Sequence, residues 1–323
     1  MIDVSCSITE RLKASMDLMG VIFVNEILCS LEKEGFIAHY FPGTKEKNKA
    51  VIVVGGASCN EKTSISMSGY LRRAGYNVLV LGFYLWKGLS KDLAKIPVEY
   101  AEKAVNWLKN TQGIEKIAMT GASTGAAYTL VCASLISDIT CVIPVVPFDY
   151  VMEGTSPNNK RLHCSVYTYK GENLPYTETP MLDKGMLNWF KMAARAKGYG
   201  LKCFMRFGYD YMSDSLNQKS RIKVENMNAD VLLLAVKDYD CWPSDVAVPR
   251  MLEVFEKNDY PHRIESYIYE RGSHALVDGF SEMSGFTKLL VKTMIPTEKK
   301  YPKECEEARR DSCARIIKFI EKW

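Results

Sequence analysis

The stretch that decides the fold reads Lys116-Ile117-Ala118-Met119-Thr120-Gly121-Ala122-Ser123-Thr124-Gly125-Ala126-Ala127-Tyr128. Its first residues have strand character, its last residues begin a helix, and Gly121 to Gly125 between them match G-x-S-x-G. Strand, sharp turn and helix in this order form a nucleophile elbow, which holds a serine hydroxyl exposed above a sheet. The helix N-terminus then directs N–H groups toward developing negative charge. We interpret Ser123 as the nucleophile; an ordinary turn with an N-cap serine is the alternative.

Working outward from the elbow, apolar runs of strand length alternate with segments of helical period. Several runs are rich in Val, Ile and Leu without alternation, which is typical of parallel strands covered on both faces. The sequence therefore predicts an α/β fold with a mostly parallel, doubly wound sheet. The expected strands are Phe36–Phe41, Val51–Val54, Val78–Phe83, Lys116–Met119, Cys141–Val146, Val231–Val236 and Ile264–Tyr269.

Helices are expected at Ser64–Ala74, Val98–Asn110 and Pro302–Lys322, the last as a charged surface helix that closes the sheet. The alternation is interrupted twice. Residues 1–35 look like an appended segment before the hydrolase-like domain of residues 36–323. Residues from about 148 to 225 carry aromatic residues, Gly and Pro without repeating strands, and this pattern predicts a lid insertion over a substrate pocket.

The catalytic partners of Ser123 should follow it in the order acid, then histidine. Of four histidines, His274 lies in the loop Gly272-Ser273-His274 after the strand at 264–269, so we take it as the base. Asp238 and Asp240 follow the strand at 231–236, and either can orient His274 and stabilise its imidazolium form.

The second oxyanion donor should come from the loop after the strand at 51–54, which reads Gly55-Gly56-Ala57-Ser58. Glycine allows backbone N–H groups to approach a substrate closely. We expect the oxyanion hole to consist of the backbone N–H of Thr124 and that of Ala57 or Gly56. Cys59 is the cysteine nearest to this predicted chemistry in sequence.

Composition excludes several classes of protein. The 323 residues are 47% apolar and 25% charged with a net charge of +4, which suits a folded domain and not a disordered chain or a dedicated nucleic-acid binder. No apolar run reaches the length of a membrane span, and the first residues lack a secretory signal. Ten cysteines without a C-x-x-C pair favour a reducing cytoplasm. Neither a metal nor a cofactor is expected.

Beyond the elbow, the chain resembles the C-terminal catalytic domain shared by acyl-CoA thioesterases and bile acid-CoA:amino acid N-acyltransferase, which has the α/β-hydrolase fold. The resemblance spans roughly residues 36 to 323. Its most specific pieces are Ile96-Pro97-Val98-Glu99-Tyr100 and Trp242-Pro243-Ser244. The other pieces are Leu89-Ser90-Lys91-Asp92-Leu93, Ala104–Lys109, the elbow, Val166–Gly171 with Leu174-Pro175-Tyr176, and Ile222–Glu225 leading into Val231–Leu234 and Asp240.

The resemblance implies a Ser–Asp–His triad acting on acyl thioesters, with Ser123 as nucleophile and His274 as base. It places the acid on Asp240, with Asp238 as the alternative. Three departures matter. Thr124, Gly125 and Ala126 stand where the family often has a lysine and paired glycines, and the N-terminal β-sandwich domain of the animal enzymes is not present in these residues. The amino-acid-conjugating branch uses a cysteine nucleophile, so serine favours hydrolysis over N-acyl transfer.

The expected substrate is a small-molecule acyl thioester or ester, and aromatic and basic residues of the predicted lid are candidates to contact its acyl chain and phosphates. A carboxylesterase, dienelactone-type hydrolase or peptidase is the main alternative, because a fold does not fix its chemistry. An N-acyltransferase and a non-catalytic binding protein are further alternatives. The sequence leaves open whether residues 1–35 cover an edge strand or contact a second subunit of a homo-oligomer. The lid candidates are Tyr167, Tyr169, Tyr176, Trp189, Phe190, Phe204, Phe207, Lys184, Lys191, Arg195 and Lys197.

Overall fold

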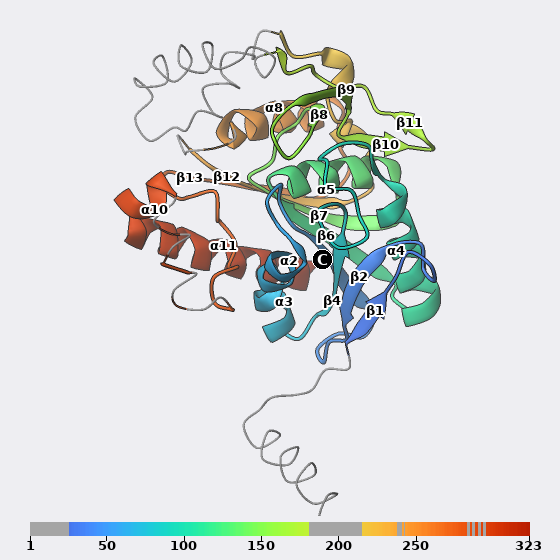
Figure 1. Cartoon of the computed structure of the whole chain (residues 1–323). Helices are drawn as coiled ribbons and strands as arrows, with labels where there is room; N and C mark the ends of the chain where they lie inside the picture. Colours follow the sequence, from blue (N-terminus) through green and yellow to red (C-terminus); the bar gives the residue numbers. More distant parts are fainter. Residues whose placement is uncertain are drawn as a thin grey trace, which may run out of the picture.

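A computed structural model describes residues 26–180, 215–237, 241, 243–282, 285, 288–289, 292 and 295–323. Its centre is an eight-stranded sheet in the order β1-β2-β4-β3-β6-β7-β12-β13 (Figure 1). β2 runs antiparallel to β1 and β4, and the remaining neighbours are parallel. The strands are β1 (Ile27–Cys29), β2 (Ile37–Phe41), β3 (Lys49–Val54), β4 (Asn77–Gly82), β6 (Lys116–Ala122), β7 (Ile139–Val145), β12 (Asp230–Val236) and β13 (Ile264–Tyr269).

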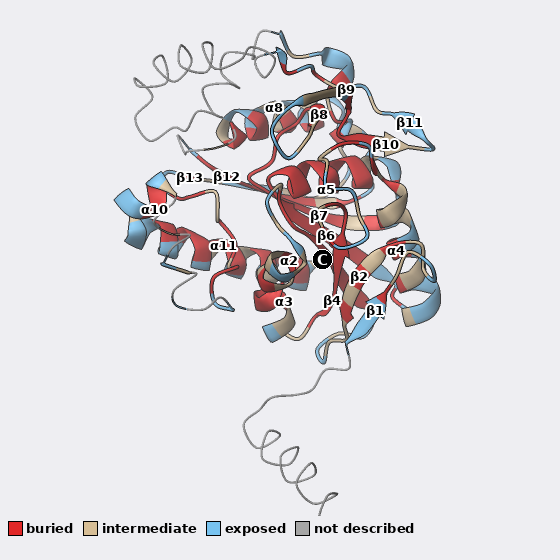
Figure 2. Cartoon of the chain, in the orientation of Figure 1, coloured by how far each residue is buried: buried red, intermediate tan, exposed pale blue. Residues whose placement is uncertain are grey.

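Both faces of the parallel strands are covered, as the unbroken apolar runs predict. In β3, Ile52 and Val54 belong to one hydrophobic cluster and Val51 and Val53 to the other, because successive side chains point to opposite faces. All of these side chains are buried, and Figure 2 shows the central strands of the sheet mostly in red, the colour of buried residues. The fold predicted from sequence is therefore confirmed: an α/β-hydrolase fold with a large, mostly parallel central sheet.

The two clusters identify which helices cover which face. Residues of α4 (Glu99–Gln112), α5 (Thr124–Leu135) and α8 (Ser244–Lys257) pack in the first cluster. Residues of α3 (Gly69–Arg73) and α11 (Pro302–Lys322) pack in the second, and α10 (Pro296–Lys300) directly precedes α11. Figure 1 shows α10 and α11 in red beside the sheet.

Two local predictions need correction. A single helix was expected over Ser64–Ala74, but the chain forms α2 (Glu61–Met67) and α3, with Ser68 between them. The hydroxyl of Ser68 bonds to the carbonyl of Ile65, and such side-chain bonds to a nearby backbone compete with helix continuation. The periodic spacing of apolar residues gives no indication of this competition.

The segment between β7 and β12 contains short strands that the sequence pattern did not predict. β8 (Glu153–Thr155) pairs with β9 (Arg161–Ser165), and β10 (Tyr167–Tyr169) pairs with β11 (Glu172–Asn173) and with β5 (Ile96–Pro97). Two 3-10 turns, η4 (Gln218–Ser220) and η5 (Val224–Asn226), lead back to β12. Strands of two to five residues are too short to produce a recognisable alternation.

β1 lies within the segment that was expected to precede the domain, and it pairs with β2 at the edge of the sheet.

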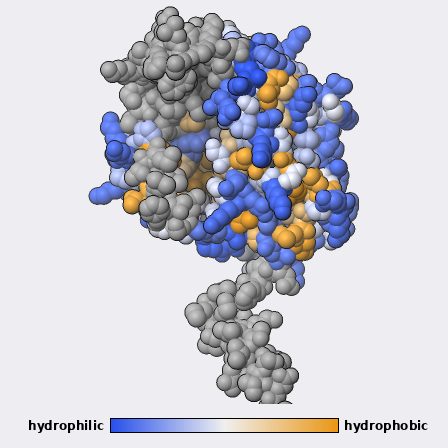
Figure 3. Space-filling view, viewed as in Figure 1, coloured by the Kyte–Doolittle hydropathy of each residue, from blue (hydrophilic) through white to orange (hydrophobic). Residues whose placement is uncertain are grey.

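No helix in the described parts of the chain is both long and apolar enough to span a bilayer. Figure 3 shows one face of the molecule, where apolar residues of the described part lie in small groups among hydrophilic ones.

Candidate active site

Ser123 lies between the last residue of β6 and the first residue of α5, as the strand–turn–helix pattern predicts. Its backbone has φ 58° and ψ −120°, a conformation that costs a residue with a Cβ of order 1–3 kcal/mol. The surroundings maintain it: the Ser123 amide donates to the carbonyl of Val145 at 3.0 Å, and the Ser123 carbonyl accepts from Ala126 at 2.9 Å. Its side chain makes no capping bond to α5, which argues against an ordinary N-cap serine.

The loop after β3 packs directly on the elbow. A Cβ built on Gly56 would lie 3.6 Å from Cβ of Ser123 and 3.3 Å from the carbonyl oxygen of Ala122. A Cβ on Gly125 would lie only 2.1 Å from the carbonyl oxygen of Gly55. The second glycine of G-x-S-x-G therefore provides clearance for the neighbouring loop. The structure brings Gly56 and Ser123 together, with Ala57 next along the same loop.

Thr124 begins α5, and its carbonyl is held by the insertion between β7 and β12. The hydroxyl of Tyr167 in β10 donates to this carbonyl at 2.8 Å. The ring of Tyr167 lies 5.4 Å from that of Tyr128, which stacks on Phe83 at 5.2 Å. Tyr167 is 2% exposed, so it packs behind the elbow and does not line an open surface.

His274 lies in the loop that follows β13, and this loop crosses the carboxyl ends of the parallel strands. A Cβ on Gly272 would lie 3.1 Å from Val236, the last residue of β12. A Cβ on Gly279 would lie 3.2 Å from Met67 in α2, on the other side of β6. Between these points, Leu276 packs in the same hydrophobic cluster as Ala122, the residue before Ser123. The loop that carries His274 therefore runs from the end of β12 to α2.

Burial dominates the titration of the candidate base. It lowers the pKa of His274 from 6.5 to about 4, because a buried imidazole loses hydration of its charged form. The neutral imidazole, which accepts a proton, is therefore the form present at neutral pH. Burial likewise raises the pKa of Cys59, whose sulfur lies 3.6 Å from that of Met67. The Cys59 thiol is thus protonated at neutral pH.

Asp238 and Asp240 lie outside the described residues, and so does Trp242. The same holds for eight candidate lid residues, namely Trp189, Phe190, Phe204, Phe207, Lys184, Lys191, Arg195 and Lys197. Within the described ranges, no three His, Cys, Asp or Glu side chains are grouped as metal ligands. The cysteines that the structure describes form no disulfide with one another.

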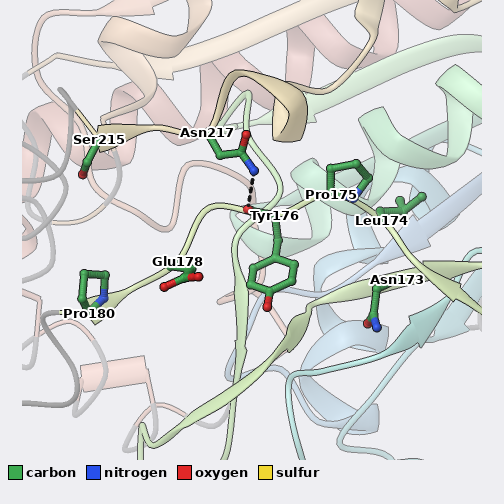
Figure 4. A pocket seen from close by; sticks show the side chains of 8 residues that line it. All are labelled: Asn173, Leu174, Pro175, Tyr176, Glu178, Pro180, Ser215 and Asn217. Atoms are coloured by element: carbon green, nitrogen blue, oxygen red, sulfur yellow. Dashed lines mark hydrogen bonds between the residues drawn. The ribbon is translucent and has the colours of Figure 1, made fainter.

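Residues of the insertion line an open pocket of about 650 Å³ with a mixed apolar and polar lining (Figure 4). Leu174, Pro175 and Tyr176 supply apolar surface, and the amide of Asn217 donates to the carbonyl of Tyr176 at 2.9 Å. Of the aromatic residues expected to contact substrate, Tyr176 lines this pocket, and Tyr167 is not part of its lining.

Sequence reasoning missed the groups that hold the His274 loop. Ser273 donates to the buried carboxylate of Glu298 at 2.5 Å, and Arg309 bonds to the same carboxylate. Arg309 and Ser312 are buried in α11, although the charged composition of this helix predicts a solvated face. The signal that could have found them is the helical spacing of Cys305, Arg309 and Ser312 along the stripe that faces the sheet.

Comparison with known proteins adds three findings. Residues 96–281 match the family described as BAAT / acyl-CoA thioester hydrolase C terminal. Acyl-coenzyme A thioesterase 1 of Rattus norvegicus is 26% identical over 220 residues, which cover 68% of this chain and 43% of the rat protein. The chain thus spans less than half of that curated relative.

Two solved structures are similar to this chain over most of its length. A putative dienelactone hydrolase from Klebsiella pneumoniae superimposes with a TM-score of 0.51 at 14% identity, covering 93% of this chain and 99% of the other. The Pyrococcus furiosus esterase Pf2001 gives a TM-score of 0.47 at 14% identity, covering 93% and 92%. At this identity the likeness concerns the fold alone.

Proposed function

Because the chain belongs to the BAAT / acyl-CoA thioester hydrolase family, we propose that it is a serine hydrolase that cleaves acyl-CoA thioesters through an acyl-enzyme. The observation that carries the proposal is the backbone of Ser123, at φ 58° and ψ −120° between β6 and α5, with Gly56 packed against it. Strained backbone at a sharp turn between strand and helix is the arrangement that a nucleophilic serine requires.

In the proposed reaction, Ser123 attacks the thioester carbonyl while His274 takes its proton. The oxyanion forms between the N–H of Thr124 and that of Ala57 or Gly56, and each donor supplies about 3 kcal/mol by analogy with single-donor deletions. Protonated His274 then gives its proton to the leaving thiolate. Water, activated by His274, releases the free acid and regenerates Ser123. Asp240, with Asp238 as the alternative, orients His274 throughout.

We also propose that the insertion at about 148–225 is a lid on a hydrolase domain of residues 36–323. Tyr167 supports this role, because its bond to the Thr124 carbonyl links the insertion to the first turn of α5. A segment attached at this point is suited to shape the acyl pocket. Serine as nucleophile favours release of the acyl group to water over transfer to an amine.

The test is thiol release from a series of acyl-CoA substrates of increasing chain length, with Ser123→Ala beside the wild type. We expect release that depends on chain length and falls by about 10⁴-fold or more in the variant. Ser134→Ala is the matched control, since the hydroxyl of this serine in the same helix donates to the nearby Val131 carbonyl. It should keep wild-type kinetics.

No release from any acyl-CoA by folded wild-type protein would overturn the thioesterase assignment. Parallel assays with p-nitrophenyl esters and peptides then identify an esterase or peptidase. Amide product in the presence of glycine or taurine would instead indicate acyl transfer. If a fluorophosphonate failed to label Ser123 in folded protein, the chain would be a binding protein.

A further inference from the structure

The loop that carries His274 is tied to the C-terminal helices by a buried ion pair. Glu298 in α10 and Arg309 in α11 are each 2% exposed. A guanidinium nitrogen of Arg309 bonds to Oε1 of Glu298, and the same oxygen accepts from Oγ of Ser273 at 2.5 Å. Nε of Arg309 donates to the carbonyl of Ala275 at 2.8 Å. The residues on both sides of His274 are therefore bonded to one buried pair.

Further bonds hold the same turn. The amide of Ala275 donates to Oγ of Ser273 at 3.2 Å, so this hydroxyl bridges the backbone on one side and Glu298 on the other. Beyond His274, the carbonyl of Leu276 accepts from Ser312 in α11. The amide of Asp278 donates to the sulfur of Cys313, one residue further along this helix. The loop thus follows α11 from Ala275 to Asp278.

Stability alone does not account for such a pair. Removing two charges from water costs several kcal/mol per ion, and apolar replacements of buried pairs are often neutral or stabilising. What an apolar pair cannot supply is directional bonding to the Ser273 hydroxyl and the Ala275 carbonyl. A general base must lie within hydrogen-bond reach of its proton donor, and a misplacement of 1 Å can cost ~10²-fold in rate. Directional bonds on both sides of His274 meet this requirement.

We infer that Glu298, Arg309 and Ser273 are positioning residues for His274, acting through the backbone of its loop. None of them touches substrate. The ion pair fixes the loop from the side of α10 and α11, and the Ser273 hydroxyl transmits this constraint to the residue before the base. This inference rests on the proposed function, since positioning has a meaning only if His274 is the base.

The test begins with Ser273→Ala, which removes one hydroxyl and leaves the ion pair intact. We expect kcat to fall by about tenfold or more while KM stays within about twofold, because alignment of the base affects the chemical step. The rate of fluorophosphonate labelling at Ser123 should fall in parallel. Ser266→Ala, on the exposed part of β13, is the matched control and should keep both rates.

Arg309→Lys gives a second, independent test. Lysine keeps a positive charge beside Glu298 but lacks the nitrogen that bonds to Ala275. We expect the same loss of kcat, and the double variant should lose less than the product of the two single effects, since both act through one loop. A purely structural role predicts a lower unfolding midpoint with normal kcat in the folded fraction. If Arg309→Lys does not fold, Ser273→Ala decides alone.

The outcomes separate this inference from the proposed function. Folded Ser273→Ala with wild-type kcat and labelling rate, beside an active wild type, overturns the positioning role and leaves the hydrolase assignment standing. A folded wild type that neither releases thiol nor labels at Ser123 overturns both. Loss of kcat with unchanged KM in Ser273→Ala, absent in Ser266→Ala, supports both.

Discussion

At the scale of single residues, Asp238 and Asp240 are alternative candidates for the triad acid, because one carboxylate orients a triad histidine. Asp240→Asn should lower kcat/KM for acyl-CoA by about 10⁴-fold, the cost of placing the histidine in the wrong tautomer. Asp238→Asn is the isosteric control in the same loop and should lose less than about tenfold. The reverse ordering would assign the role to Asp238, and two small effects would remove the aspartate from the mechanism.

His274 gives a prediction for the pH dependence. Its pKa of about 4 lies below the ordinary 6.5, so the neutral, proton-accepting imidazole persists until the pH falls to about 4. We therefore expect kcat/KM to stay level from pH 8 to about 5 and to fall below about pH 4. Steady-state kinetics across this range, with circular dichroism at each pH to confirm folding, measure it. An acid limb near 6.5 would show that burial does not control this base.

Among the elements, β10 contacts α5 through the Tyr167 ring and the Tyr167 hydroxyl, and Tyr167→Phe removes only the hydroxyl. The loss of the bond to the Thr124 carbonyl should lower the free energy of unfolding by about 1 kcal/mol, the usual net value of a hydrogen bond. It should also lower kcat, because the first turn of α5 carries a proposed oxyanion donor. Urea denaturation and thioesterase kinetics measure the two effects.

Tyr128→Phe is the matched control for this element. Tyr128 is also fully buried, and its hydroxyl donates at 2.6 Å to the carbonyl of Pro97, away from the elbow. It should lose similar stability and keep kcat. Equal kinetics for the two variants would remove the link between β10 and the oxyanion hole.

The sequence predicted elements well where one local pattern determines the structure. The run Val51–Val54 predicts a doubly covered strand, and Gly121 to Gly125 between a strand and a helix predict the turn at Ser123. The sequence predicted elements poorly where a long-range contact determines the structure. The two- and three-residue strands β5 and β10 pair only because the insertion folds back on the chain. This pairing leaves no periodic pattern of apolar residues in the sequence.

For the whole molecule, the same distinction between local patterns and long-range contacts explains which parts of the candidate site the sequence predicts. The order of Ser123 and His274 along the chain follows from the topology that the strand pattern predicts. The burial of Arg309 does not, because a charged residue on an amphipathic helix is usually solvated. Its partner Glu298 lies on a different helix, and only the folded chain brings the two to the loop of Ser273.

The strand order also has a consequence for the time course of synthesis. β6 completes its pairing with β3 and β7 from residues 49–145, whereas β12 and β13 arrive only after the insertion has been made. At ~5–20 residues per second, the ribosome adds His274 about 8 to 30 s after Ser123. During that interval the nascent chain carries Ser123 without the proposed base. If His274 acts as proposed, the elbow gains its proton acceptor only when nearly all of the domain has been translated.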